Sequence, residues 1–378
     1  MTTQAYDFAI IGAGIAGASV ASELAREASV LLLEMEPQPG YHTTGRSAAM
    51  FAPGYGPQPI RALTRASARF FNHPPEGFCA TPLLKQRDVV MIARPDQRAA
   101  FDAHAAALAT ESAITVIEAA DLQTRVPLLR KGYAERALLD TSGSDIDVHC
   151  LHQGFLRAFR KSGGSLVTRA EVCDLTRDNQ IWRIATGADV YRAKTVINAA
   201  GAWAGQIGAL AGAEAIGLVP KRRTALIIAP PPGLEIGDLP LCVDIDEAFY
   251  LKPDAGKLLV SPANEDPMAP CDVQPDEMDI ALCIDRIERA FDLRVRRVEN
   301  QWSGLRSFVA DKCPVVGYSD RVDGFFWLAG QGGYGIQTAP ALARLATALA
   351  QKRAIPADIL AQRLDPDSIA PARLRALA

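Results

Sequence analysis

The residues most suited to chemistry in this chain are three glycines near its start, in the sequence G-A-G-I-A-G from Gly12 to Gly17. They follow an apolar run of strand length, Tyr6 to Ile11, and precede a helix-like stretch. Gly12 permits a tight turn, Gly14 lets a pyrophosphate approach the backbone, and Gly17 lets the helix lie close to the strand. The first turn of such a helix offers unpaired N–H groups to phosphate oxygens. The pattern therefore predicts a dinucleotide-binding site.

A second strand-like run, 29–33, ends in Glu34, at about the 20-residue spacing at which an acid binds ribose hydroxyls. Glu34 favours an unphosphorylated adenosine ribose but does not separate NAD from FAD. The following stretch, 38–55, is rich in small and hydroxyl residues and contains Arg46. Its hydroxyls and guanidinium can bind phosphate oxygens, which favours FAD. A flexible surface loop is the alternative interpretation, because Gly, Pro, Ser and Thr mark loops in general.

A further glycine cluster, G-Q-G-G-Y-G-I-Q from Gly330 to Gln337, lies near the other end of the chain. It follows an apolar strand-like run and precedes a predicted helix from Ala339 to Gln351. A helix N-terminus at this point can stabilise negative charge on a reduced flavin ring. A glycine-rich turn before a terminal helix is the alternative. Two strand–glycine–helix units at opposite ends of one chain suit a large, two-ended cofactor.

The composition is that of an ordinary globular protein with a large core. The 378 residues are 49% hydrophobic and 22% charged, and the formal net charge of −3 gives no electrostatic basis for binding nucleic acid. Seven cysteines without a C-x-x-C pair predict free thiols in a reducing compartment. The first strand begins close to Met1, and no stretch is apolar enough for a confident membrane span, so we expect a cytoplasmic protein.

No metal site is predicted. His149 and His152 lie near Asp145 and Asp147, which is a set of residue types that can bind a metal ion. We interpret Asp147 instead as the N-cap of a helix through Arg160, with the two histidines in its first turns.

Helical stretches and antiparallel, proline-punctuated stretches alternate along the chain. We predict an α/β fold (α+β overall) in which a Rossmann-type nucleotide-binding domain is interleaved with a β-rich substrate domain. The nucleotide-binding domain is expected to be discontinuous, comprising residues 1–80, 141–215 and 309–378. The substrate domain is expected to comprise residues 81–140 and 216–308.

These motifs together resemble the FAD-dependent D-amino acid oxidase, glycine oxidase and sarcosine oxidase superfamily over essentially the whole chain. The resemblance rests on the opening glycines and on T-T-G-R-S-A-A, N-A-A-G-A-W, G-L-R-S-F and G-Q-G-G-Y-G-I-Q. More narrowly, F-Y-L-K-P-D-A-G, S-P-A-N and G-L-R-S-F-V-A-D resemble bacterial D-arginine dehydrogenases. The superfamily resemblance implies FAD as the cofactor. Cys313 is not at the position where some members tether the flavin, so non-covalent FAD is expected.

The resemblance also implies which residues bind the flavin. They lie in the opening glycine motif, the following acid, the hydroxyl-rich loop, one strand valine and the C-terminal glycine cluster. These residues are Gly12, Ala13, Gly14, Gly17, Glu34, Met35, His42, Thr43, Thr44, Gly45, Arg46, Ser47, Ala48, Ala49, Val172, Gly332, Gly333, Tyr334, Gly335, Ile336 and Gln337.

Five positions are implied to bind or position an amino acid substrate. Arg306 and Arg223 would hold its carboxylate, because a guanidinium binds a carboxylate through two parallel hydrogen bonds. Tyr250 would close on the same carboxylate, and Tyr55 would hydrogen-bond it or gate the pocket. The carbonyl oxygen of Gly333 would accept a hydrogen bond from the substrate amine.

The chain departs from the D-arginine dehydrogenase pattern at two substrate positions. Where that pattern has a histidine and a guanidinium-binding glutamate, this chain has Met50 and Val89. The second alignment is ambiguous by one residue, so Asp88 is an alternative to Val89. If Val89 is the equivalent, a cationic side chain would lack its partner, and apolar or small D-amino acids would be preferred.

The implied reaction is oxidation of a D-amino acid to its imino acid, with hydride transfer from Cα to flavin N5 and subsequent hydrolysis to a 2-oxo acid. Hydride transfer from a neutral amine requires no strong general base, and none is evident among these positions. Two alternatives stay open: oxidation of N-methyl or other secondary amino acids, and a flavin-binding subunit without turnover of its own. The sequence leaves open the electron acceptor, whether O2 or quinone-like, and the oligomeric state.

Overall fold

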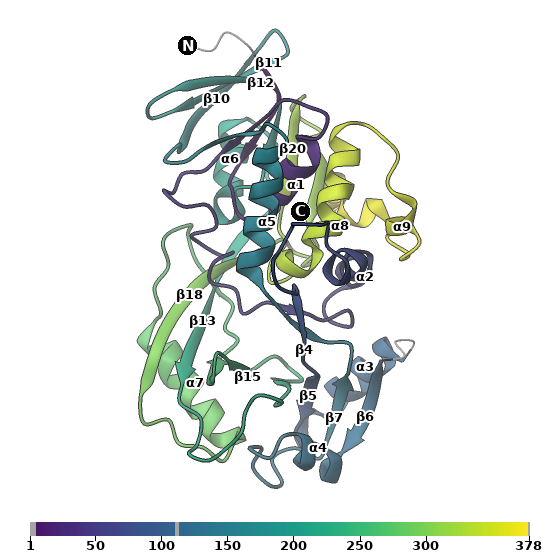
Figure 1. Cartoon of the computed structure of the whole chain (residues 1–378), viewed down its shortest axis with the longest axis vertical. Helices are drawn as coiled ribbons and strands as arrows, with labels where there is room; N and C mark the ends of the chain where they lie inside the picture. Colours follow the sequence, from purple (N-terminus) through teal and green to yellow (C-terminus); the bar gives the residue numbers. More distant parts are fainter. Residues whose placement is uncertain (1–4, 110–112, 377–378) are drawn as a thin grey trace.

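The chain folds around two large β-sheets that lie in different parts of the molecule. The structure, a computed structural model, describes residues 5–109 and 113–376. In Figure 1 the upper part combines purple, teal and yellow segments, whereas the lower part combines blue and green segments. The chain therefore passes between the two parts several times. The predicted mixed α/β fold with an interleaved chain is confirmed.

The first sheet has the parallel centre that a nucleotide-binding fold requires. Its central strands run parallel in the order β20-β12-β1-β2-β9. The antiparallel strands β11 and β10 extend it from β12, and the antiparallel strand β19 extends it from β20. These strands are β1 (Tyr6–Ile11), β2 (Val30–Leu33), β9 (Ser165–Val167), β10 (Val172–Asp178), β11 (Ile181–Thr186), β12 (Val190–Asn198), β19 (Val315–Tyr318) and β20 (Phe325–Ala329). Strands β2 and β20 are wholly buried, and β1 and β12 are buried at their C-terminal ends, as expected for parallel strands covered on both faces, whereas β9 at the edge is half-buried.

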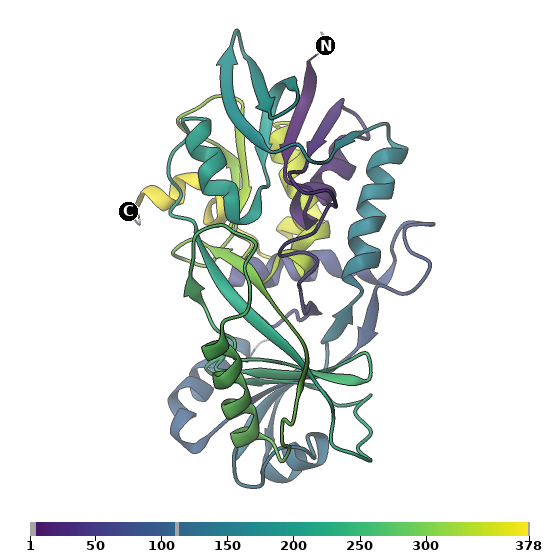
Figure 2. The same cartoon turned by 90° about the vertical axis from the view of Figure 1, so that its left-hand side faces the viewer.

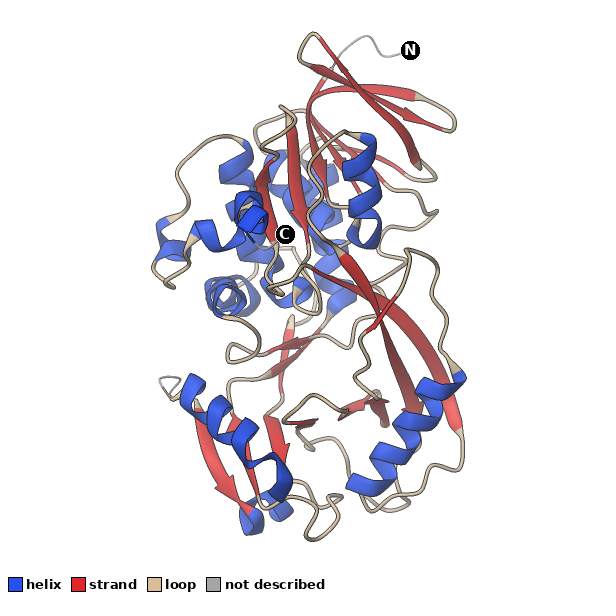
Figure 3. Ribbon diagram, turned by 180° about the vertical axis from the view of Figure 1, so that it is seen from behind, coloured by secondary structure: helices blue, strands red, loops and turns tan. Residues whose placement is uncertain are grey.

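Helices pack on this sheet and bury its apolar faces, as Figure 3 shows from behind. They are α1 (Ile15–Leu24), α2 (Gln58–Asn72), α5 (Val148–Lys161), α6 (Ala204–Leu210), α8 (Gly335–Ala350) and α9 (Ala357–Leu360). Helix α1 contacts both α5 and α8, so the helix after the opening glycines sits at the centre of this layer. The side chain of Asp147 accepts a hydrogen bond from Cys150 N, which confirms it as the N-cap of α5.

The second sheet is mostly antiparallel and forms the lower part of the molecule. Its strands are β5 (Val89–Ala93), β6 (Ile114–Glu118), β7 (Arg136–Asp140), β13 (Val219–Ile228), β14 (Leu241–Asp244), β15 (Tyr250–Asp254), β16 (Lys257–Ser261), β17 (Asp266–Pro267) and β18 (Val298–Phe308). The helices α3 (Arg98–Leu108), α4 (Ala119–Arg125) and α7 (Glu277–Ala290) belong to this part. The long antiparallel pair β13–β18 reaches from the lower part toward the upper part (Figure 2).

A small third sheet lies where the chain crosses between the two parts. It contains β3 (Met50–Phe51), β4 (Leu84–Gln86) and β8 (Ser144–Ile146). The carboxylate of Asp145 on β8 is held by Arg87 Nε at 2.5 Å and by Lys252 Nζ at 2.6 Å. Both cationic side chains are buried, so this carboxylate compensates two charges at the crossing.

The strands of the first sheet fall within the residue ranges expected for the nucleotide-binding domain. Those of the second sheet fall within the ranges expected for the substrate domain. The exact domain boundaries stay a prediction, and residues 1–4 and 377–378 at the ends of the first domain lie outside the described residues.

Two details differ from the sequence-based expectations. Cys79 and Cys150 form a disulfide, so the prediction that all seven cysteines are free thiols was wrong. The tertiary fold brings together two cysteines that are 71 residues apart, which their spacing does not reveal. The last long helix begins at Gly335 and not at Ala339, because the glycine cluster forms its first turn.

Two kinds of feature are absent from the described residues. None of their helices is both long and apolar enough to cross a membrane. They contain no group of three or more His, Cys, Asp or Glu side chains placed to hold a metal ion.

We predict that Gly17→Ala destabilises the protein and impairs cofactor binding, whereas Gly205→Ala does not. A Cβ at Gly17 would lie 1.9 Å from Gly12 O, but one at Gly205 meets no atom within 4 Å. Both glycines are helical, so alanine at Gly205 should be neutral or gain about 0.5–1 kcal/mol. Thermal unfolding and flavin content of the two variants measure the difference, and equal stability would contradict the close packing of α1 on β1.

Candidate active site

Three neighbouring cavities form a continuous row from the first sheet to the second. We name them after one lining residue each: the Glu34 cavity of about 160 Å³, the Arg46 cavity of about 120 Å³ and the Val89 cavity of about 370 Å³. Gly14, Thr43 and Thr44 line both the Glu34 and Arg46 cavities. The Arg46 and Val89 cavities share Ser47, Ala48, Arg223, Tyr250, Arg306 and Gly333.

The opening glycine motif has the geometry that its sequence predicts. Gly12 has a φ of +98°, which a glycine adopts readily and other residues rarely do. Ala13 N donates to Glu34 Oε2 at 2.8 Å, so the acid at the end of β2 fixes the glycine turn. Burial raises the pKa of the Glu34 carboxyl. Gly14 is the N-cap of α1 and has no side chain to cap it, and the first turn of this helix borders the Glu34 and Arg46 cavities.

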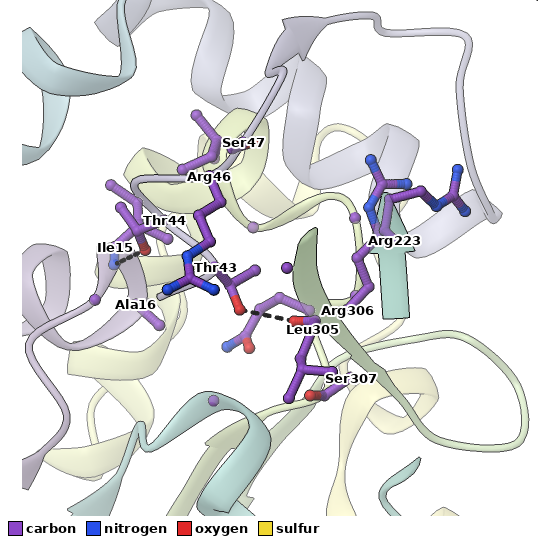
Figure 4. Close-up of a pocket in the computed structure, with 18 of the residues that line it drawn as sticks. Ile15, Ala16, Thr43, Thr44, Arg46, Ser47, Arg223, Leu305, Arg306 and Ser307 are labelled. Atoms are coloured by element: carbon purple, nitrogen blue, oxygen red, sulfur yellow. Dashed lines mark hydrogen bonds between the residues drawn. The ribbon is translucent and has the colours of Figure 1, made fainter. Parts of the chain in front are cut away.

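The hydroxyl-rich loop 42–49 runs along the row of cavities and is fixed at both sides. Thr44 Oγ1 accepts from Ile15 N at 3.0 Å, and Thr43 Oγ1 donates to Leu305 O at 2.7 Å (Figure 4). Trp302 Nε1 donates to Arg46 O at 2.9 Å. The loop therefore joins the first turn of α1 to strand β18.

Arg46 lines the central cavity, but its guanidinium is already engaged by protein atoms. Its Nη1 donates to Val273 O and Ser303 O, and its Nη2 pairs with Asp272 Oδ1 at 2.5 Å. The expectation that Arg46 contributes charge to a phosphate stays a prediction. Its observed contacts also link the loop to the second sheet.

The C-terminal glycine turn packs directly against the predicted substrate arginine. A Cβ at Gly333 would lie 2.7 Å from Arg306 Nη1, so a larger residue there would displace the guanidinium from its observed position. Gly332 has a φ of +54°, and its N–H donates to Ser307 O at 3.0 Å. The turn that begins α8 is thereby bonded to β18.

The two predicted substrate arginines lie on neighbouring strands of the second sheet. Arg223 is on β13 and Arg306 is on β18, and the pairing register places Arg223 opposite Gly304 and Arg306 opposite Lys221. Residues two apart on a strand share a face, so the two guanidiniums project from the same face of the pair. Figure 4 shows them side by side at the edge of the cavity.

The charges of these two arginines are strongly affected by burial and by each other. Arg223 is 7% exposed, its Nε is buried without a hydrogen-bond partner, and burial together with Arg306 lowers its pKa. Burial also acts to lower the pKa of Arg306, but Tyr250, Tyr55 and Glu247 outweigh it and raise that pKa. Arg223 is buried and Arg306 is half-buried, and two adjacent cations placed in this way favour binding of an anion.

Both predicted tyrosines line the same cavity. Tyr250 begins β15, and Tyr55 lies in the turn before α2 with its ring 5.4 Å from that of Tyr334. Burial and the nearby Glu247 raise the pKa of Tyr55 well above its usual value and that of Tyr334 to about 12. The phenols of Tyr55 and Tyr334 are therefore protonated at neutral pH and can donate hydrogen bonds.

The Val89 cavity resolves the one-residue ambiguity in the sequence. Val89 and Met91 on β5 line it, together with Met50, whereas Asp88 and Val90 line a separate cavity. Asp88 Oδ2 is 3.5 Å from Arg125 Nη1 and faces away from the Val89 cavity. The alternative in which Asp88 occupies the acidic position is therefore not supported.

Most predicted cofactor residues line the three cavities, and the others support them. The lining residues are Gly12, Gly14, Glu34, Met35, His42, Thr43, Thr44, Arg46, Ser47, Ala48, Ala49, Val172, Gly332, Gly333, Tyr334, Gly335, Ile336 and Gln337. Ala13, Gly17 and Gly45 do not line them. Ala13 O bonds to His152 Nε2 at 2.8 Å, Gly17 packs on Gly12, and Gly45 N donates to Gly40 O.

Sequence reasoning missed two acids near the substrate arginines. Glu247 lies in the turn between β14 and β15 with a φ of +55° and lines the Val89 cavity. Glu265 contacts Arg223 from outside the cavity. No motif marks either residue, since only the tertiary fold brings them to the arginines.

The fold and the row of cavities define a flavin-dependent oxidoreductase, and comparison with known proteins agrees. The family model described as FAD dependent oxidoreductase (DAO) matches residues 7–349. The chain therefore belongs to the DAO family of FAD-dependent oxidoreductases.

Individual relatives cover this chain to different extents. Glycine oxidase from Geobacillus kaustophilus is 24% identical over 379 residues, covering 93% of this chain and 94% of the relative. Hydrogen cyanide synthase subunit HcnC from Pseudomonas aeruginosa is 27% identical, covering 63% of this chain and 59% of that protein. Human mitochondrial dimethylglycine dehydrogenase is 26% identical, but the match spans only 28% of its length.

Solved structures share the fold. The crystal structure of L-proline dehydrogenase from P.horikoshii superposes with a TM-score of 0.84 at 19% identity and covers 99% of this chain and 98% of that one. Glycine oxidase from Geobacillus kaustophilus superposes with a TM-score of 0.80 at 21% identity, covering 93% and 96%.

The residues of the three cavities fit FAD. The Glu34 cavity has an acid and a buried strand edge for an adenosine, and the Arg46 cavity has an open helix N-terminus for phosphates. The C-terminal glycine turn borders both the Arg46 and Val89 cavities, so a flavin ring there would reach the two arginines. FAD binding therefore accounts for the row of cavities as a whole.

We predict that the FAD is released when the protein is denatured. Among the described residues, no cysteine lines any of the three cavities, so no thiol is placed to form a covalent bond to the flavin. The purified protein should be yellow, and acid precipitation should leave the yellow colour in the supernatant as FAD. Flavin that stays in the pellet would contradict the prediction.

Proposed function

We propose that this protein oxidises the Cα–N bond of a D-amino acid to an imino acid, which water hydrolyses to a 2-oxo acid and ammonia. The observation that carries the proposal is the pair of adjacent arginines, Arg223 buried and Arg306 half-buried, on the wall shared by the Arg46 and Val89 cavities. Bound FAD would supply the hydride acceptor. The D configuration rests on the sequence resemblance.

The side chains around this wall have separate tasks in the proposed reaction. Arg306 and Arg223 bind the substrate carboxylate, and Tyr250 donates to the same group. Gly333 O accepts from the amine. Glu247, whose carboxylate interacts electrostatically with both arginines, supplies a negative charge on the same wall as the arginine pair.

The walls of the Val89 cavity favour an apolar substrate side chain. Met50, Val89, Met91, Leu241 and Val243 line it, and its volume of about 370 Å³ is far larger than a glycine requires. Burial of an apolar side chain there contributes about 25 cal/mol per Å². The carboxylate of Asp244 is fully buried and already bonded to Arg94 and Gln97, so it is not available to a cationic side chain.

Oxidation of a secondary or N-methylated amino acid is the second candidate function. Relatives named dimethylglycine dehydrogenase, and a solved structure described as iminodiacetate oxidase, carry substrate names of this type. The same arginine pair serves such a substrate, because it also has a carboxylate. Flavin bleaching under anaerobic conditions across D-, L- and N-methyl amino acids separates the two candidates, and no bleaching by any of them supports a flavin-binding subunit.

We predict that Arg306→Met weakens substrate binding and leaves FAD bound. Loss of a buried, charge-assisted carboxylate contact costs about 2–5 kcal/mol, which lowers kcat/KM by about 30-fold or more. Arg297→Met, at an exposed arginine just before β18, is the matched control and should behave like the parent protein. An unchanged kcat/KM in Arg306→Met rules out the assigned role.

We predict that the protein prefers D-Met or D-Phe to D-Arg, and that Val89→Glu shifts this preference toward D-Arg. A cationic side chain that leaves water needs a countercharge, whereas an apolar one gains from burial. The measurement is kcat/KM for the three amino acids with both proteins. A large preference of the parent protein for D-Arg would show that another acid, such as Glu247, already serves as the cation's partner.

A further inference from the structure

Glu265 is the centre of a cluster of charges behind the substrate arginine Arg223. Its carboxylate contacts Arg223 Nη2 at 3.3 Å, Lys221 Nζ at 2.9 Å and Lys312 Nζ at 3.2 Å. Burial acts to raise the pKa of Glu265, but the two lysines outweigh it and lower that pKa. Glu265 is therefore ionised at neutral pH and faces three cations.

The two lysines that hold Glu265 are themselves fixed. The ammonium groups of Lys221 and Lys312 lie 5.5 Å and 5.4 Å from the centre of the Phe308 ring, within cation–π range. Phe308 in turn packs against Gly332, where a Cβ would lie only 2.1 Å from the ring. The carboxylate is thus attached to the same strand and glycine turn that position Arg306.

We propose that Glu265 is a positioning residue that orients Arg223 to receive the substrate carboxylate. Glu265 Oε1 accepts a hydrogen bond from Arg223 Nη2, whereas the buried Nε of Arg223 has no hydrogen-bond partner. Glu265 also supplies a countercharge 3.3 Å from Arg223, which offsets the repulsion between Arg223 and the neighbouring Arg306. The inference rests on the proposed function, because it assumes that Arg223 binds a carboxylate.

The test uses 4-methylpentanoate as the probe, because it has the carboxylate and side chain of leucine without the amine. Its dissociation constant is measured from the change in flavin absorbance in the holoenzyme. Glu265→Gln should raise this constant about tenfold, since it removes the negative charge that strengthens the hydrogen bond from Arg223. The matched control is Glu299→Gln, at an exposed glutamate of β18 that pairs with Lys257 of β16. This variant should leave the dissociation constant unchanged.

A double-mutant cycle separates positioning of Arg223 from a general structural role. If Glu265 acts through Arg223, Glu265→Gln should have no further effect in a protein that already carries Arg223→Met. If Glu265→Gln weakens probe binding equally in proteins with and without Arg223, or weakens it in neither, the proposal is overturned. If Arg223→Met alone leaves probe binding unchanged, the carboxylate clamp of the proposed function fails instead.

A second variant keeps the test valid if Glu265→Gln loses its flavin. Lys221→Met removes one cation that holds Glu265 without altering a residue that lines the Val89 cavity. We expect it to weaken probe binding in the same direction and to a smaller extent, with unchanged flavin content. Probe binding equal to that of the parent would contradict the role of the cluster.

Discussion

The antiparallel pair β13–β18 is the constraint on which the candidate site depends. Along β18, alternate residues bond to β13, so the carbonyl oxygens of Ser303, Leu305 and Ser307 point to the opposite edge. These three oxygens accept hydrogen bonds from Arg46, Thr43 and Gly332 N, respectively. One strand edge therefore holds both the hydroxyl-rich loop and the C-terminal glycine turn, and its other edge sets the register of the two arginines.

This arrangement places two like charges side by side, Arg223 buried and Arg306 half-buried, which is costly without compensation. Arg223 has Glu265 as a partner, and Arg306 interacts with Tyr250, Tyr55 and Glu247. The compensation is incomplete because Arg223 Nε keeps no hydrogen-bond partner. A bound carboxylate would complete it, so part of the substrate affinity comes from charges that the fold has already desolvated.

The sequence was sufficient to predict the features that depend on local pattern. The glycine turn at Gly12, the N-cap Asp147 and the mixed α/β class follow from spacing and residue type, and the structure confirms them. The pairing of Cys79 with Cys150 and the approach of Glu265 to Arg223 were not predictable. Both join segments that are far apart in the chain, and their contact depends on tertiary packing that no local pattern encodes.

The chemistry of the substrate cavity depends on the register of a single strand. Side chains alternate between the faces of β5, so Val89 and Met91 face the Val89 cavity while Asp88 faces Arg125 on the other side. A shift of one residue would bring the acid into the cavity and exchange an apolar wall for a charged one. The two arginines lie on β13 and β18, so the register of β5 does not affect them. In the proposed function, recognition of the carboxylate and selection of the side chain would therefore be physically separate, and the same arginine pair would serve amino acids of different side-chain class.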